Sequence, residues 1–237
     1  MKSFSKILFV SAAILALLSC SKENPQDEDD SAMPTPELVD LGLSVKWASC
    51  NLGASKPEQY GSLFQWAGTR DETSSGKNLG WDNCPYHNGP SSLRGWTKYV
   101  RSSWASYWSG KGSPDNKTVL DPEDDAAHVK LGGFWRMPTN AEFRELIDNC
   151  TSEWMTLNGV NGRKFTSKKN GNSIFLPAAG SRYRHYPVHE SGSAGYYWSS
   201  SLCESPSSAN DMHIKSGGAD ENNEYRYTAC SIRPVSK

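Results

Sequence analysis

The stretch TNAEFRELIDNC, residues 139–150, carries the clearest secondary-structure signal in the chain and decides between the main fold classes. Thr139 and Glu142 have the spacing of a capping box, in which two side chains satisfy free backbone N–H groups at the start of a helix. Apolar side chains then recur on one helical face, at Phe143, Leu146, Ile147 and Cys150. We therefore predict an amphipathic helix whose apolar face lies in the core.

The sequence after this helix has the pattern of short β-strands. Asn-Gly pairs at 158–159, 161–162 and 170–171 are turn dipeptides that accept positive φ. They predict a hairpin formed by residues 163–167 and 173–176.

Further strands are predicted on both sides of this hairpin. The runs 39–43, 45–48 and 63–66 precede the helix, and 196–199 and 225–235 follow the hairpin. In the segment 211–215, Met212 and Ile214 alternate with Asp211, His213 and Lys215, so one side should face the core and the other water. Helices early and strands late indicate an α+β domain.

A second helix is predicted upstream, where Asp121-Pro122-Glu123-Asp124 begins a run that ends at Gly132-Gly133. Asp121 is a suitable N-cap, and Pro122 fits the first helical position because its missing N–H costs nothing there. The acidic side chains also suit the positive end of a helix. They could alternatively bind a metal ion, but capping accounts for them, and we expect no metal site.

Residues 69–118 form a long segment without a clear period, rich in Ser, Gly, Asn and Lys. It contains Trp81, Trp96, Trp104 and Trp108. We predict a loop-rich excursion that these tryptophans hold against the domain. Excursions of this length are often functional, and a purely structural insertion is the alternative.

Composition restricts the class of protein. The 237 residues include 25 basic and 26 acidic side chains, so the formal net charge is -1. A near-neutral chain is not a strongly basic nucleic-acid binder, and we expect no nucleic-acid partner. With 9 Trp, 10 Tyr and 7 Phe, the chain has the large apolar groups that disordered chains lack.

The first residues have the pattern of an export signal. Lys2 and Lys6 precede an apolar run at 7–18 that is too short to span a membrane and fits a signal peptide. The sequence Leu17-Leu18-Ser19-Cys20 then reads as a lipobox, in which cleavage before Cys20 allows acyl chains to anchor the protein in a membrane. We predict a signal peptide at 1–19 and lipidation of Cys20. An ordinary signal peptide with a chance cysteine is the alternative.

Residues 20–37 are predicted to be a tether between the acylated cysteine and a domain at 38–237. The segment is acidic, contains Pro and has almost no apolar residues, so it cannot form a core. An acidic run at this place is similar to the surface-export signal of Bacteroidetes lipoproteins. That similarity implies an outer-membrane protein that faces the cell exterior, and a plain solvated linker is the alternative.

Seven motifs follow one another in the rest of the chain. They are VDLGL (39–43), WASCNLGA (47–54), EQYG (58–61), WRMPT (135–139), FLPAAG (175–180), GYYWSSS (195–201) and SIRPV (231–235). With them the chain resembles the Fibrobacter succinogenes major paralogous domain, found in many Bacteroidetes lipoproteins. The resemblance implies a C-type lectin-like fold, as in formylglycine-generating enzymes and the variable proteins of diversity-generating retroelements. Such a fold would have two short helices, a mostly antiparallel twisted sheet and chain ends that lie close together.

The resemblance also implies where a ligand binds. In the variable proteins a YWSS-type strand precedes a variable segment that an SVRPV-like end closes, and residues 202–230 occupy that place here. Outward residues of a rigid sheet can change at little cost to the core, and Tyr adds contact area at low entropic cost. The candidate ligand-binding residues are Ser208, Asn210, Asp211, His213, Lys215, Asp220, Asn222, Asn223, Tyr225 and Tyr227. Whether this segment is actively diversified stays open.

A loop at 182–190 supplies two further candidates, Arg182 and Tyr183. It also contains Arg184, His185, Tyr186 and His189, a set that could bind an anion or a sugar. A solvated polar loop is the alternative.

The chain lacks the catalytic motifs of the related folds. Formylglycine-generating enzymes use a closely spaced cysteine pair, and Cys203 and Cys230 lie too far apart in sequence to match it. The EPN, QPD and WND motifs of calcium-dependent lectins are missing, and the serines at 199–201 lack a GxSxG context. We therefore expect a non-enzymatic protein without a cofactor.

Five cysteines remain besides Cys20, namely Cys50, Cys84, Cys150, Cys203 and Cys230. An exported protein can form disulfides. A pair between Cys50 and Cys150 is predicted because both sit at the ends of core elements, and Cys203 with Cys230 is the alternative.

These expectations combine into a lipoprotein, anchored in the membrane by its lipid, that binds a protein or a glycan through its 202–230 face. Two alternatives are an oxidase-like enzyme of the formylglycine-generating type and a structural accessory of a surface fibre or glycan-uptake complex.

Overall fold

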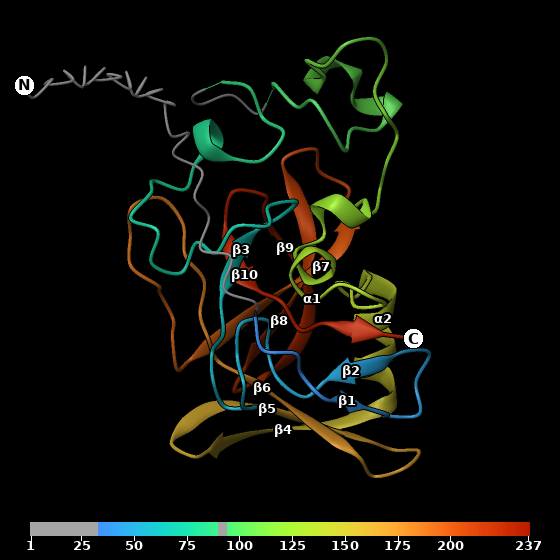
Figure 1. The fold of residues 1–237 in the computed structure, drawn as a ribbon, viewed down its shortest axis with the longest axis vertical. Coiled ribbons are helices and arrows are strands. Elements are labelled where there is room, and N and C mark those ends of the chain that lie inside the picture. The colour runs from blue at the N-terminus through green and yellow to red at the C-terminus, as the bar shows by residue number, and fades with distance from the viewer. Residues whose placement is uncertain (1–32, 90–93) are drawn as a thin grey trace, which may run out of the picture. The chain divides into compact units, whose positions relative to one another are not determined.

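The computed structural model describes residues 33–89 and 94–237 (Figure 1). The helices are η1 (Trp81–Asn83), η2 (Ser102–Tyr107), η3 (Pro122–Asp124), α1 (Ala126–Leu131) and α2 (Asn140–Asn149), where η denotes a 3-10 helix. The strands are β1 (Leu38–Val39), β2 (Lys46–Ala48), β3 (Leu63–Gln65), β4 (Cys150–Leu157), β5 (Val160–Ser167), β6 (Ser173–Pro177), β7 (Ala194–Leu202), β8 (Ser208–Lys215), β9 (Gly218–Tyr225), β10 (Ala229–Ser231) and β11 (Val235–Ser236).

The strands form three sheets, with the orders β1-β2-β11, β3-β10-β7-β8-β9 and β4-β5-β6. Among the described strands every pairing is antiparallel except that of β10 with β7. This arrangement confirms the predicted α+β class. Because β1 and β11 both pair with β2, the two ends of the domain lie together, as expected.

The predicted signal peptide, Cys20 and most of the tether lie outside the described residues. In the part of the chain that the structure describes, no helix is both long and apolar enough to cross a membrane.

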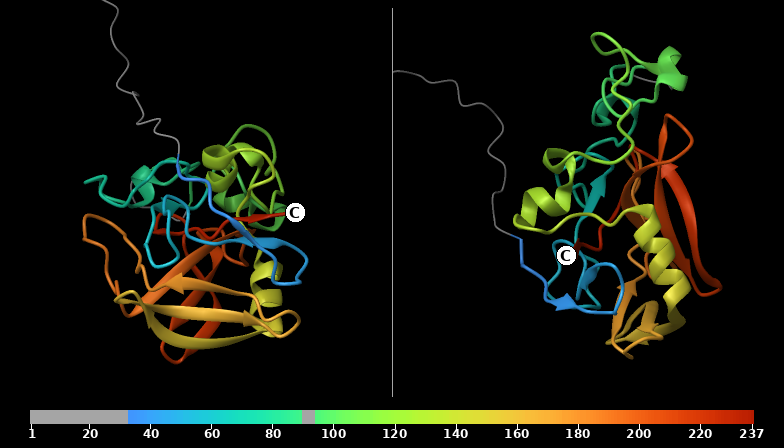
Figure 2. Two further views of the ribbon diagram at one scale, coloured as in Figure 1. Left: turned by 60° about the horizontal axis from the view of Figure 1, so that its bottom comes forward. Right: turned by 90° about the vertical axis from the view of Figure 1, so that its right-hand side faces the viewer.

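The predicted helix at 139–150 is α2, and its capping box is present. The Thr139 side chain accepts from the Glu142 N–H, and the Glu142 carboxylate accepts from the Thr139 N–H at 2.7 Å. Phe143 and Leu146 are fully buried, and the Phe143 ring lies 5.5 Å from that of Trp47. Figure 2 shows α2 lying along the strands β7 to β9. The helix therefore packs as its apolar stripe predicts.

The predicted helix after Asp121 begins later than expected. Asp121 precedes the short turn η3 and makes no capping hydrogen bond with its side chain. The cap of α1 is Asp125, whose carboxylate accepts from the N–H groups of Ala127, His128 and Met137. The last of these comes from a segment beyond α1, so tertiary contacts select Asp125 as the cap. The helix ends at Leu131, before Gly132 at φ 68, as predicted.

Side chains of the five-stranded sheet alternate between two faces, which we name the α2 face and the loop face. The α2 face buries Tyr197, Met212 and Ile214 in one core with α2 and the sheet β4-β5-β6. The loop face carries Tyr196 and Trp198 in a second core with residues of β3.

The predicted hairpin is β5–β6, which is extended by β4 across the Asn158-Gly159 turn.

The C-terminal SIRPV motif is fixed by a buried arginine. The Arg233 guanidinium donates to Asn51 Oδ1, to the Ala48 carbonyl at 3.1 Å and to the Phe175 carbonyl at 2.7 Å. Burial lowers the pKa of Arg233. The carbonyl and amide oxygens replace its lost water, and they join the C-terminal segment to β6 and to the end of β2.

The excursion at 69–118 is held against the domain by aromatic packing, as predicted. Trp96 is fully buried. The Arg226 guanidinium lies 4.1 Å from the centre of the Trp96 ring and 5.0 Å from that of Trp66. Trp81, Trp104 and Trp108 pack at the edge of the same cluster. This cation–π arrangement joins the excursion to the segment that follows β9.

The five cysteines of the described residues are unpaired and buried. The predicted disulfide between Cys50 and Cys150, and the alternative between Cys203 and Cys230, are therefore wrong for this structure. Cys150 lies in the core that contains α2. Cys50 instead donates its thiol to the Ala54 carbonyl at 3.1 Å.

Candidate functional site

The predicted ligand-binding residues of 202–230 divide between the two faces of the sheet. Pairing of β8 with β9 places His213 opposite Asp220 and Asp211 opposite Asn222 on the loop face. It places Asn210 opposite Asn223, and Ser208 opposite Tyr225, on the other side. A single ligand would not contact the whole predicted set.

Four predicted residues are buried, which corrects the expectation that they face outward. Ser208, Asp211, Tyr227 and Arg182 are each no more than 9% exposed. Lys215, Asp220, Asn223 and Tyr225 are exposed, and Asn210, His213, Asn222 and Tyr183 are partly buried.

Arg182 and Tyr227 are buried because they hold the excursion in place. The Arg182 guanidinium donates to the carbonyls of Glu72 at 3.0 Å and Lys77 at 2.7 Å. The Tyr227 ring lies 4.6 Å from Trp81, edge to face, and is stacked on Tyr225 at 5.2 Å. Of this aromatic group, Tyr225 is the most open, with 47% exposure.

A group of three acidic side chains, which we name the Asp211 group, occupies the loop face. It consists of Asp211 on β8, Glu224 on β9 and Glu190 in the loop before β7. Among the described residues, neither carboxylate oxygen of the fully buried Asp211 accepts a hydrogen bond of ordinary geometry, although the Asn222 side chain, opposite it on β9, favours its charged form. Burial, and next the charge of Glu224, raise the pKa of Asp211 well above its ordinary value. A buried carboxyl group without a partner is costly and points to a function.

The other two acids of the group lie close enough to affect one another. Burial raises the pKa of Glu224, and the charge of Glu190 adds to the increase. Glu190 accepts a hydrogen bond from the Tyr196 hydroxyl. In the described ranges none of the three acids forms an ion pair with Lys or Arg. Within residues 33–89 and 94–237, the group has one ionic neighbour, His189, whose Nδ1 lies 3.8 Å from Glu190.

Aromatic rings border the Asp211 group. The rings of Tyr196 and His213 are stacked, with centroids 4.5 Å apart and an angle of 10°. His189 lies 6.1 Å from Tyr196, and Tyr183 lies 5.0 Å from His189. This row of rings joins the 182–190 loop to β8, so Tyr183 and His213 belong to one surface. The buried Nε2 of His213 has no partner among the described residues, and burial lowers the pKa of this ring.

Three members of this site were not among the predicted residues: Glu190, Tyr196 and Glu224. Glu224 shares its face with Asp220 and Asn222 by simple strand alternation, a signal that the sequence contains. Glu190 and Tyr196 lie before the 202–230 segment, and only the tertiary fold brings them to it.

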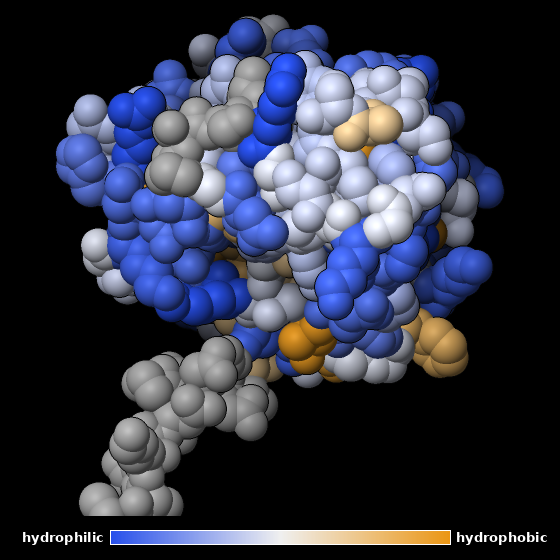
Figure 3. All heavy atoms as spheres, turned by 90° about the horizontal axis from the view of Figure 1, so that it is seen from above, coloured by the Kyte–Doolittle hydropathy of each residue, from blue (hydrophilic) through white to orange (hydrophobic). Residues whose placement is uncertain are grey.

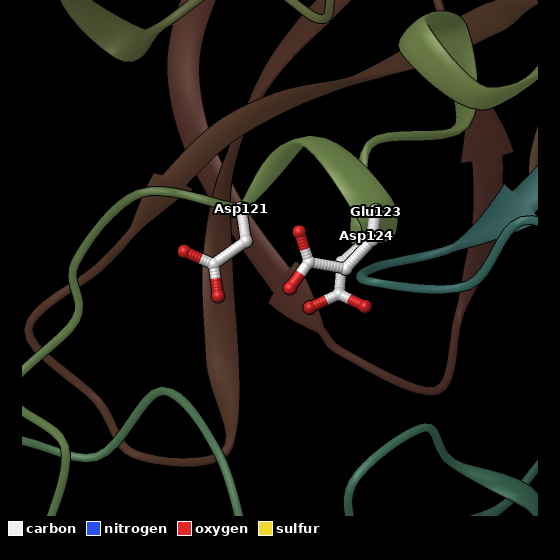
Figure 4. A group of neighbouring side chains, drawn as sticks. All are labelled: Asp121, Glu123 and Asp124. Atoms are coloured by element: carbon white, nitrogen blue, oxygen red, sulfur yellow. The ribbon is translucent and has the colours of Figure 1, made fainter.

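A second acidic group, Asp121, Glu123 and Asp124, has the spacing of metal ligands (Figure 4). Lys98 already lies among them, with its Nζ 2.7 Å from Asp121, 3.3 Å from Glu123 and 2.5 Å from Asp124. The hydroxyl of Tyr86 also donates to Asp124, at 2.5 Å. Because an ammonium group occupies the centre, the arrangement favours an internal ion network over a metal site.

The side chains of a serine, a histidine and a glutamate also lie in a row near the site. Ser181 Oγ is 2.8 Å from His189 Nε2, and His189 Nδ1 is 3.8 Å from Glu190. Ser181 is only 2% exposed, and the second distance exceeds a hydrogen bond. The arrangement therefore orients the His189 ring and does not present a nucleophile to a substrate.

The described thiols are also poor candidates for chemistry. Burial raises the pKa values of Cys50, Cys84, Cys150, Cys203 and Cys230. A buried thiol that stays protonated is a weak nucleophile and metal ligand.

A shallow hollow of 280 Å³ lies away from the loop face, beside β1 and the sheet β4-β5-β6. Its lining is mainly apolar and includes Val39, Leu157 and Phe175, with Lys164 as its charged residue. It contains no acid and no unpartnered buried polar group, so the loop face remains the stronger candidate.

Comparison of the chain with profiles of protein families, with curated proteins and with solved structures found no match.

Proposed function

We propose that this protein is a surface-anchored recognition lipoprotein that binds its ligand through the loop face of β7, β8 and β9 and the 182–190 loop. Lipidation of Cys20 would attach it to the outer membrane, facing the cell exterior. The supporting observation is the Asp211 group, in which a buried carboxyl without a partner sits between a polar strand and a row of rings. We also propose the C-type lectin-like fold of the major paralogous domain family.

The chemistry of the loop face suits binding better than catalysis. Its polar groups stand on paired strands, which position side chains accurately. Nearby, the serine is covered and the thiols are protonated, so neither supplies a nucleophile. Figure 3 shows a mostly polar surface over the part of the molecule seen from above, with small apolar spots. Polar and aromatic contacts are therefore the expected means of recognition on the described surface.

The face can be tested with the full-length chain in detergent micelles on protein and glycan arrays. Asp220→Ala and Lys215→Ala change exposed residues of the loop face, and we expect each to alter binding, with Asp220→Ala weakening it, while Tm stays unchanged. Asn223→Ala is the matched control, because Asn223 is exposed on the same strand but has the opposite orientation. Equal binding by all three variants would reject the loop face as the binding surface.

A further inference from the structure

We propose that the ligand is a polypeptide whose lysine or arginine side chain binds the Asp211 group while its backbone pairs with the free edge of β9. This inference rests on the proposed function, because it names the ligand class of the same face. It depends on three features: an acidic group without a cation, a row of rings beside it, and an unpaired strand edge.

The first feature is a missing counter-ion. Elsewhere in the described chain, Asp124 contacts Lys98 and Glu142 contacts Arg136, both at 2.5 Å. The buried Asp125 has no such ion pair, but its carboxylate accepts backbone N–H groups. Glu190, Asp211 and Glu224 have no Lys or Arg partner in the same residues. Asp211 is fully buried and Glu224 is partly buried, whereas the Glu190 side chain is 49% exposed. Like charges held close together raise one another's energy, most strongly for the buried members. A cation from a ligand would relieve that repulsion.

The second feature is the aromatic border. Tyr196 and His213 stack face to face at 4.5 Å, directly beside the acids, and Tyr196 donates its hydroxyl to Glu190. Because Tyr196 is only 8% exposed, the carbon stem of a cationic side chain would lie on the more open His213 ring and place its charge near Glu190 and Glu224. Asp211 lies below, fully buried, and would act through its charge rather than by direct contact.

The third feature favours a polypeptide over an amino sugar. In the five-stranded sheet, β9 pairs with β8 and has no second neighbour among the described strands. Residues 218–224 form no backbone hydrogen bond with any described residue outside the β8–β9 pair. An exposed edge can accept another strand. On its loop face this edge carries Asp220 and Glu224, charges that repel acidic strands and would select a basic one.

Binding of a cation should lower the pKa values of the acids that it approaches. The pKa values of Asp211 and Glu224 are raised, and a nearby positive charge favours their ionised forms. The other titratable groups around Asp211 are Glu190, His213, Lys215, Asp220, Tyr196 and Cys230. Of these, Lys215 is exposed at the end of β8 and forms no ion pair with the group in the described residues.

The test uses the full-length chain in detergent micelles and an array of extended peptides that contain lysine or arginine. Matched peptides have norleucine in place of the basic residue, and a chitosan oligosaccharide represents amino sugars. We expect basic peptides to bind and norleucine peptides to bind about tenfold more weakly, the effect of one lost ionic contact. Glu224→Gln and Glu190→Gln should each reduce basic-peptide binding by a similar factor.

The matched control is Glu221→Gln, which changes a glutamate of the same strand that faces α2 and pairs with Arg144. It should leave peptide binding unchanged. N-methylation of alternate peptide amides should abolish binding if the peptide pairs with β9. Tm measurements on each variant exclude unfolding as the cause of a loss.

The outcomes separate this inference from the proposed function. If norleucine peptides or chitosan alone bind, and Asp220→Ala weakens that binding, the loop face is a recognition surface but the cationic-polypeptide inference is wrong. If basic peptides bind and no loop-face variant affects them, both proposals are wrong. Proton release on peptide binding, measured by calorimetry in buffers of different ionisation enthalpy, would support the inference, and its absence would count against it.

Discussion

The two acidic groups of this protein contain the same kind of side chain in opposite surroundings. In the group of Asp121, Glu123 and Asp124, the Lys98 ammonium lies within 3.3 Å of all three carboxylates. In the Asp211 group no Lys or Arg pairs with any described member. The first group is therefore complete as it stands and ties the excursion to η3. The second lacks a positive partner, and a ligand can supply it.

The two acidic groups should also respond in opposite ways to a change of pH. Hydrogen bonds from Lys117 and then Lys98 lower the pKa of Asp121, so its contribution to stability is present above the ordinary carboxyl pKa and is lost as pH falls. Burial raises the pKa of Asp211. The Asp211 carboxyl group therefore binds its proton more tightly in the folded than in the unfolded chain. The free energy of unfolding should decline as pH rises above about 4. Lowering the pH should therefore reduce the stability contributed by the group of Asp121, Glu123 and Asp124, and it should favour the folded state at the Asp211 group.

The largest expected effect comes from removing the cation of the complete group. Lys98→Met leaves three acids without their shared partner, and we expect a loss of about 2–3 kcal/mol in the free energy of unfolding at neutral pH. This is below the range for a fully buried pair because the Lys98 side chain keeps 18% exposure. Denaturant unfolding measures it, with Lys117→Met, at 44% exposure, as the milder control. An equal loss in both variants would mean that Lys98 is not the central partner.

The next effect tests the incomplete group. Asp211→Asn removes the carboxyl whose pKa is raised, so the wild-type chain should lose stability relative to the variant as pH rises from about 4 to 8. Each pKa unit of increase would add about 1.4 kcal/mol to the difference between the two proteins. Thermal unfolding across this range measures it. Parallel curves for the two proteins would show that Asp211 is ionised as readily in the folded as in the unfolded chain.

A smaller effect tests whether Glu190 belongs to the Asp211 group. Tyr196→Phe removes the hydroxyl that donates to Glu190, and we expect a loss of about 1 kcal/mol in the free energy of unfolding. Tyr186→Phe is the control, because that side chain is 46% exposed and packs at the edge of the loop. If both variants unfold alike, Glu190 is not held by the sheet.

The smallest expected effect is no effect at all. Addition of calcium or magnesium ions, or their removal with a chelator, should leave the Tm of the full chain unchanged, because Lys98 occupies the centre of the acidic group with metal-like spacing. A clear increase in Tm with either ion would contradict this account of the group.

Signals between residues that are close in the sequence were sufficient to predict much of the secondary structure. The capping box of Thr139 and Glu142 and the apolar stripe of α2 involve neighbouring residues, and both are present. The Asn-Gly pairs at 158–159 and 170–171 lie at turns for the same reason, but the turn predicted at 161–162 was wrong, because these residues lie inside β5 and pair with its neighbouring strands. The start of α1 was wrong because Asp121 pairs with Lys98, and Asp125 accepts from Met137, contacts that are not local in the sequence.

The site was predictable only in part. Alternation correctly placed Met212 and Ile214 inward, and it placed His213 and Lys215 on the other face. It could not show that Asp211 is covered, because that depends on segments distant in the chain. Glu190 lies at the end of the predicted 182–190 loop, but no local signal in the sequence shows that this loop approaches β9. Glu224 follows from strand alternation with Asp220 and Asn222.

The sheet β1-β2-β11 also has a mechanical consequence. A pull applied N-terminal to Leu38, while a partner holds β8 and β9, would load the two short pairings of β1 with β2 first. Behind them the Arg233 hydrogen bonds fasten the C-terminal segment to β6 and to the end of β2. We expect β1 to separate from β2 first under tension, while the strands that would bind the ligand keep their register.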